Sequence, residues 1–96
     1  MLEFNTTLKT LGLASNGLGD EGAIAIAKGL QGNTTLTSLD LYRNSIGAKG
    51  GKAIAKALEG NTALTKVSLL SNSLDDDAKN ALREAVKGRE GFTLDL

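Results

Sequence analysis

The chain repeats itself every 28 residues, and this period constrains its fold more than any other feature. The complete units are residues 5–32, 33–60 and 61–88, and residues 89–96 begin a fourth. The first two units are identical at 15 of 28 positions without a gap. A unit of this length is one supersecondary element that buries its apolar face only by stacking on its neighbours. We therefore expect residues 1–96 to form a single solenoid domain.

Each unit has two halves with different apolar periods. In the first half apolar residues alternate with polar or small ones, as Leu39 and Leu41 do, and a period of two predicts a short strand. In the second half, spacings of three, four, seven and eight predict a helix with one buried face. In the first unit this expected inner face comprises Gly22, Ala25, Ile26, Gly29 and Leu30. The fold class is therefore α/β, with three strand-plus-helix repeats and a C-terminal strand within residues 89–96.

The pattern LxxLxLxxNxL followed by a helix resembles the leucine-rich repeat family, in its ribonuclease-inhibitor-like class. In the second unit the pattern is filled by Leu36, Leu39, Leu41, Asn44 and Ile46, and the resemblance extends from residue 5 to residue 88. It implies a curved solenoid with a parallel sheet on its concave face and helices on its convex face. It also implies a domain that binds other proteins, usually through the concave face.

Asparagine recurs at one position of this pattern, at Asn16, Asn44 and Asn72. An amide side chain donates and accepts hydrogen bonds at once, so stacked asparagines can satisfy backbone groups left unpaired where a strand turns towards a helix. The family resemblance implies the same asparagine ladder. We therefore expect these residues to be structural and not ligands.

The outward positions of the predicted strands are candidates for partner binding. Tyrosine and arginine are enriched at interface hot spots, while a charged pair and an apolar anchor add complementarity. We predict a partner-binding site on the concave face that comprises Asp40, Tyr42, Arg43, Lys66 and Leu70. The alternative is a solvated strand face without a ligand.

The start of the solenoid is a second candidate surface. Only four residues precede the first unit, too few for a strand-plus-helix cap, and an uncapped strand offers a free edge to another chain. Some apolar residues of the first helix also lie off its expected inner face. We predict self-association, with a homodimer as the commonest closed form, through Leu2, Phe4, Ala23, Ile24 and Ala27.

Composition narrows the chemistry. The chain has no Cys and no His, which removes thiol nucleophiles, imidazole bases and the usual zinc sites. Eleven basic residues balance eleven acidic ones, which argues against a dedicated nucleic-acid or acidic-membrane binder. The run Asp75–Asp77 lacks the ligand spacing of a calcium loop and is expected to start a helix. We expect no enzyme activity, cofactor, metal or small-molecule substrate, and no nucleic-acid or membrane partner.

These observations favour a non-catalytic protein-interaction module or scaffold with a protein partner. The default compartment is the cytoplasm, because no apolar run approaches the roughly 18 residues that span a bilayer and the N-terminus is not a signal peptide. One alternative is a designed or excised structural scaffold with no ligand, since regular spacing and a short leader fit a truncated or engineered solenoid. Another is a fragment of a GTPase-activating leucine-rich-repeat protein, in which Arg43 would donate charge to a phosphate.

Overall fold

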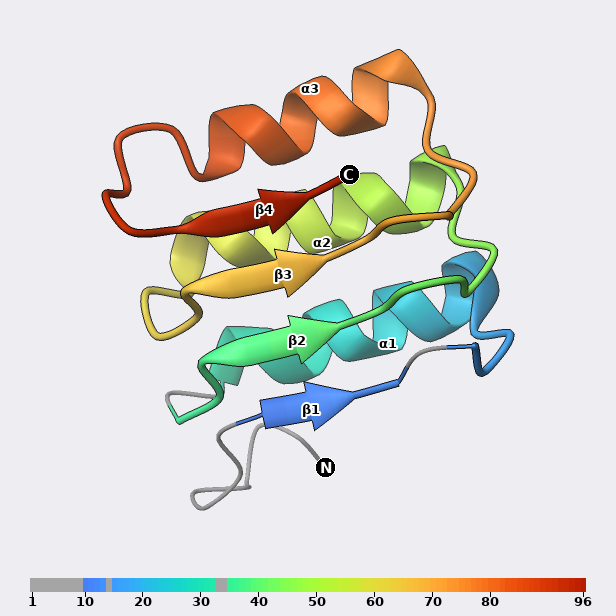
Figure 1. Ribbon diagram of the computed structural model, residues 1–96, viewed down its shortest axis with the longest axis horizontal. Helices are drawn as coiled ribbons and strands as arrows, with labels where there is room; N and C mark the ends of the chain where they lie inside the picture. The colour runs from blue at the N-terminus through green and yellow to red at the C-terminus, as the bar shows by residue number, and fades with distance from the viewer. Residues whose placement is uncertain (1–9, 14, 33–34) are drawn as a thin grey trace.

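The computed structural model describes residues 10–13, 15–32 and 35–96, and in these residues strands alternate with helices along the chain (Figure 1). The strands are β1 (Thr10–Gly12), β2 (Ser38–Asp40), β3 (Lys66–Ser68) and β4 (Thr93–Asp95). The helices are α1 (Gly19–Gly32), α2 (Ala48–Gly60) and α3 (Asp76–Ala85). The predicted α/β class, with three strand-plus-helix repeats and a C-terminal strand, is confirmed.

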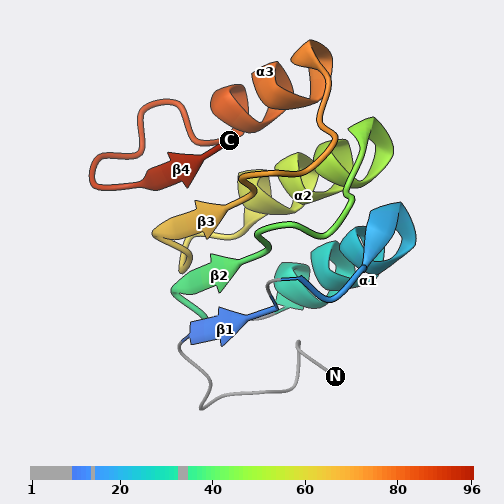
Figure 2. The same cartoon turned by 45° about the vertical axis from the view of Figure 1, so that its right-hand side comes forward.

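The strands form one parallel sheet in the order β1-β2-β3-β4. Their register follows the repeat, because Leu11 pairs with Leu39, Leu39 with Val67, and Val67 with Leu94. All three helices lie on one side of the sheet, so the molecule has two layers (Figure 2). We call the side of the strands that points away from the helices the open sheet face.

The core lies between the two layers. The strand columns that the period of two predicted are buried in the second and third units, where Leu39, Leu41, Val67 and Leu69 are at most 1% exposed. Helix residues close the core from the other side, and they include Leu30, Ile54, Leu58 and Leu82. Each repeat therefore buries its apolar residues against its neighbours, as a solenoid requires.

The asparagine ladder joins successive repeats. The Asn44 side-chain oxygen accepts from the N–H groups of Asn16, at 2.8 Å, and Leu18, at 3.4 Å, while its amide nitrogen donates to the Leu13 carbonyl at 2.7 Å. Asn72 repeats this arrangement one unit later and accepts from the N–H groups of Asn44 and Ile46, both at 2.9 Å. Asn44 is fully buried, Asn72 is half-buried and Asn16 is exposed. The ladder bonds therefore run from the Asn44 side chain to the first repeat and from the Asn72 side chain to the second, and of the three asparagines only Asn44 is fully buried.

A second polar column runs along the opposite ends of the helices. The buried Asn61 amide donates to the Leu30 carbonyl at 2.8 Å. Arg89 stands 28 positions later and donates to the Leu58 carbonyl at 3.3 Å and to the Leu64 carbonyl at 2.6 Å. The Arg89 guanidinium also lies 4.7 Å from the centre of the Phe92 ring. Arginine thus takes over, in the last unit, the bonding that asparagine provides before it.

Small residues bring α1 and α2 close together. A β-carbon added to Gly50 would lie 2.9 Å from the Ala23 methyl carbon, and Ala23 and Ala27 are only 0% and 4% exposed. The expected inner face of α1 is correct at Gly29 and Leu30, which are buried, and wrong at Ala25. Ala25, placed on that face by its spacing, is exposed, because it lies on the opposite side of α1 from the residues that meet α2.

Helix starts are capped in two different ways. Gly47, which precedes α2, has no capping side chain, and Asp20 of the preceding repeat accepts from the N–H groups of Gly47 and Gly50, both at 2.8 Å. Asp75 precedes α3 and accepts from the N–H of Ala78 at 2.8 Å. The acidic run at 75–77 therefore starts a helix, as predicted, with its other two members in the first turn.

Candidate functional site

The open sheet face holds a shallow hollow across its strands. The alternation of side chains along each strand directs one set away from the helices, and these side chains come into line because the strands are parallel and in register. The hollow encloses about 290 Å³. It is lined by Gly12, Ser38, Leu39, Asp40, Lys66, Ser68 and Asp95.

Asp40 and Lys66 supply charge to this hollow from adjacent strands. Asp40 is half-buried, and its carboxylate accepts from the N–H of Tyr42 at 3.1 Å, which holds it against the turn that follows β2. Lys66 is exposed and pairs in register with Ser38 of β2. The hollow therefore presents a cation and an anion from neighbouring repeats, and Asp95 of β4 adds a second carboxylate.

Two large apolar side chains stand at the ends of β2 and β3. Tyr42 is 39% exposed and Leu70 is 41% exposed, and among the described residues they are the exposed large hydrophobic side chains. They occupy the same position in successive repeats, and the N–H of Arg43 donates to the Leu70 carbonyl at 3.1 Å. Tyr42 and Leu70 thus form an exposed apolar pair at the end of the open sheet face, beside the charged hollow.

Arg43 occupies a backbone conformation that the repeat imposes. Its φ is +59°, and the same position has φ of +58° at Ser15 and +59° at Ser71. This left-handed geometry allows the chain to turn after each strand, and it recurs whatever side chain is present. The Arg43 side chain is exposed at the rim of the site and plays no part in forming the turn.

The structure divides the predicted partner-binding residues into two neighbouring groups. Asp40 and Lys66 line the hollow, whereas Tyr42, Arg43 and Leu70 lie in the turns that follow the strands. Asp95 also lines the hollow but was not among the residues selected from sequence. The alternation of "TLDL" at residues 93–96 matches that of the earlier strands, and it places Asp95 at an outward position.

The predicted self-association surface is wrong at Ala23 and Ala27. Both are buried, because this flank of α1 packs against α2 instead of facing outwards. Ile24 is half-buried. Leu2 and Phe4 lie outside the described residues. Of the three residues that the structure describes, Ile24 alone is partly accessible.

Comparisons with known proteins agree with this architecture. The family model described as Leucine Rich repeat matches residues 4–27 and 32–55. A search of curated protein sequences found no significant match. Among solved structures, the one titled Leiomodin-1 Actin-Binding Site 2 (ABS2) is similar to this chain, with a TM-score of 0.84 and 34% sequence identity. The similarity covers 98% of this chain and 56% of that one, so the chain spans little more than half of the related structure.

Among residues 10–13, 15–32 and 35–96, none of the helices combines the length and the apolar character that crossing a membrane requires.

Proposed function

Because the chain belongs to the leucine-rich repeat family, we propose that it is a non-catalytic protein-binding module whose working surface is the open sheet face. The main support for this proposal is the exposure of Tyr42 and Leu70, at 39% and 41%, on adjacent repeats. Large apolar side chains exposed together mark protein-contact surfaces, and tyrosine is enriched among interface hot spots.

The charged hollow beside these residues supports the same surface. Asp40 and Lys66 come from paired strands, and the Asp40 carboxylate is held by the Tyr42 N–H. Charges fixed in this way orient a partner and discriminate between partners more than they add affinity. Tyr42 and Leu70 would then anchor the partner, and the charged hollow would fix the partner's position along the strands.

Actin is the first partner to test, because the similar solved structure is titled an actin-binding site. Tyr42→Ala with Leu70→Ala is the matched double variant, since alanine is the residue at the same position, 14, of the first repeat. We expect labelled actin to bind the unmodified chain and to bind the double variant at least about tenfold more weakly, because both truncations remove interface area. Fluorescence anisotropy measures both affinities.

Lys52→Ala is the control for this experiment, because Lys52 is exposed on α2 in the helical layer. Its affinity for actin should equal that of the unmodified chain, and circular dichroism should show that every variant is folded. No binding by the unmodified chain would reject actin as the partner. Binding that survives the double substitution would reject the open sheet face.

A further inference from the structure

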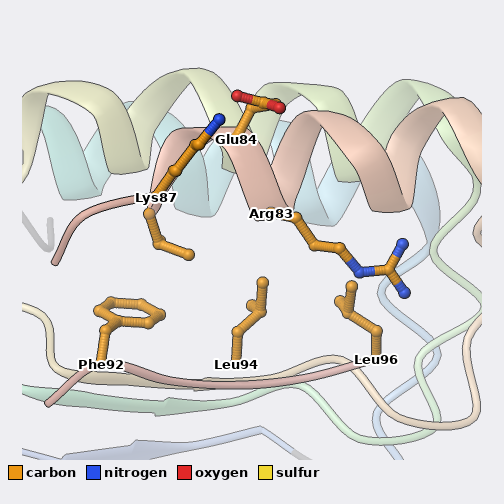
Figure 3. Close-up of a pocket in the computed structure, with 7 residues that line it drawn as sticks. Arg83, Glu84, Lys87, Phe92, Leu94 and Leu96 are labelled. Carbon is orange, nitrogen blue, oxygen red and sulfur yellow. The ribbon is translucent and has the colours of Figure 1, made fainter. Parts of the chain in front are cut away.

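The end of the solenoid beside α3 carries a groove that is separate from the open sheet face. It encloses about 450 Å³ between α3 and the segment that includes β4. It is lined by Arg83, Glu84, Val86, Lys87, Phe92, Leu94 and Leu96. Figure 3 shows Phe92, Leu94 and Leu96 in a row, with their side chains pointing towards α3. None of these residues lines the hollow on the open sheet face.

The floor of the groove continues the buried columns of the core. Leu94 pairs in register with Val67, and Val67 is fully buried. Leu94, Leu96 and Phe92 are only half-buried, because no described helix covers β4 as the helices cover the strands before it. Apolar side chains in this state favour an occupant that removes them from water.

The side of α3 that lines the groove differs from the corresponding sides of α1 and α2, which pack against the following helix. On α1 that flank carries Ala23 and Ala27, and on α2 it carries Gly51 and Ala55. A β-carbon added to Gly51 would lie 3.2 Å from the Ala78 methyl carbon, which shows how closely α3 approaches α2. The corresponding residues of α3 are Lys79 and Arg83. A helix with small residues cannot approach α3 as closely, so the occupant must accommodate long basic side chains.

The charges around the groove indicate the chemistry of that occupant. Figure 3 shows the Arg83 guanidinium reaching over Leu96 at one end of the apolar row. At the other end the Arg89 guanidinium lies over the Phe92 ring, at 4.7 Å from its centre. Lys87 lines the rim together with Glu84, and the charged ends of both side chains point away from the apolar row (Figure 3). Arginines thus stand at both ends of an apolar strip, and carboxylates complement them.

We propose that this groove binds an amphipathic helix of a partner protein, with an apolar face on the row Phe92–Leu94–Leu96 and carboxylates beside Arg83 and Lys87. The row spans four residue steps, or about 13 Å at about 3.3 Å per residue. About nine helical residues cover that length, which is the scale of a helix seated in an apolar groove. The surface is independent of the partner-binding role of the open sheet face.

A pair of designed peptides tests this proposal. Both are helical and about 15 residues long, with leucines at spacings of three and four, and their flanking positions carry glutamate in one and lysine in the other. Fluorescence anisotropy should show the glutamate peptide binding the chain at least tenfold more tightly than the lysine peptide. Amide chemical shifts should change at residues 92–96 and stay constant at 38–40.

Arg83→Glu should reverse the preference between the two peptides, because it replaces the cation over Leu96 with an anion. Arg83 is exposed, so the variant should remain folded, which circular dichroism checks. Lys56→Glu is the matched control, because Lys56 is exposed on α2 away from the groove, and it should leave both affinities unchanged. Equal binding of the two peptides, or an unchanged preference in Arg83→Glu, would overturn the proposal. So would a dimer in light scattering that Arg83→Glu dissociates, since a second copy would then be the occupant.

Discussion

Asn44 connects three repeats through its side chain and its backbone. The side-chain oxygen accepts from the first repeat, the amide nitrogen donates to the Leu13 carbonyl, and the Asn44 N–H donates to Asn72 of the third repeat. The Asn44 side chain is fully buried, so its own polar atoms have lost their access to water. Leaving buried backbone groups without partners costs more than the hydrogen bond itself contributes.

Asn44→Ala is therefore expected to lower the free energy of unfolding by about 1–3 kcal/mol. Urea unfolding followed by circular dichroism measures the change. Asn80→Ala is the control, because Asn80 is exposed on α3, and it should change stability by less than about 0.5 kcal/mol. Equal stability of the two variants would show that the ladder does not hold the repeats together.

At the scale of elements, the fold depends on how closely consecutive helices approach. At Gly50 α1 and α2 approach closely, because an added β-carbon would lie 2.8 Å from an Asp20 oxygen and 2.9 Å from carbon atoms of Ala23 and Ile46. The same Asp20 oxygen caps α2 through the Gly47 and Gly50 N–H groups. One aspartate and one glycine therefore lie together at the contact between the first two repeats.

Gly50→Ala is expected to destabilise the domain by at least about 1 kcal/mol, because overpacking at this contact outweighs the better helix propensity of alanine. Gly60→Ala is the matched variant at the other end of the same helix, where nothing lies within 4 Å of an added β-carbon. It should stabilise the domain by about 0.4–1 kcal/mol. Thermal unfolding of both variants gives the comparison, and a stabilised Gly50→Ala would contradict the close approach of α1 and α2.

The sequence predicted the elements better than it predicted the faces of the helices. The leucine columns and the role of Asn44 were evident because the same residue types recur every 28 positions. Ala25 was misplaced because Ala25 and Ala27 are chemically identical, and periodicity alone cannot tell which of the two is exposed and which meets the next helix. Only the packing of α2 distinguishes them.

Two polar features were missed for different reasons. The hydrogen bond from Asn61 to the previous repeat could have been predicted from the sequence. Each unit begins with asparagine, at 5, 33 and 61, and Arg89 occupies the same position of the last unit. The capping of α2 by Asp20 could not be predicted from a recurring pattern, because it occurs between one pair of repeats and reaches across 27 residues. Contacts that do not recur leave no periodic pattern in a sequence.

At the scale of the whole molecule, two layers create two distinct surfaces. The open sheet face presents Tyr42, Leu70 and the charged hollow, while the groove lies at the end of the solenoid beside α3. The candidate residues on the sheet face could be selected from sequence because they interrupt the repeat with large or charged side chains. The groove could not, because it depends on the position of β4 beneath α3.

Hydrogen exchange with mass spectrometry, measured with and without monomeric actin, tests whether the open sheet face is a binding surface. If the open sheet face is the working surface, actin should slow amide exchange in segments 38–43 and 66–71, which contain Asp40, Tyr42, Lys66 and Leu70. Exchange in α1 and α2, which form the helical layer, should stay as it is in the free protein. Protection confined to the helices or to residues 92–96, with segments 38–43 and 66–71 unchanged, would contradict the account.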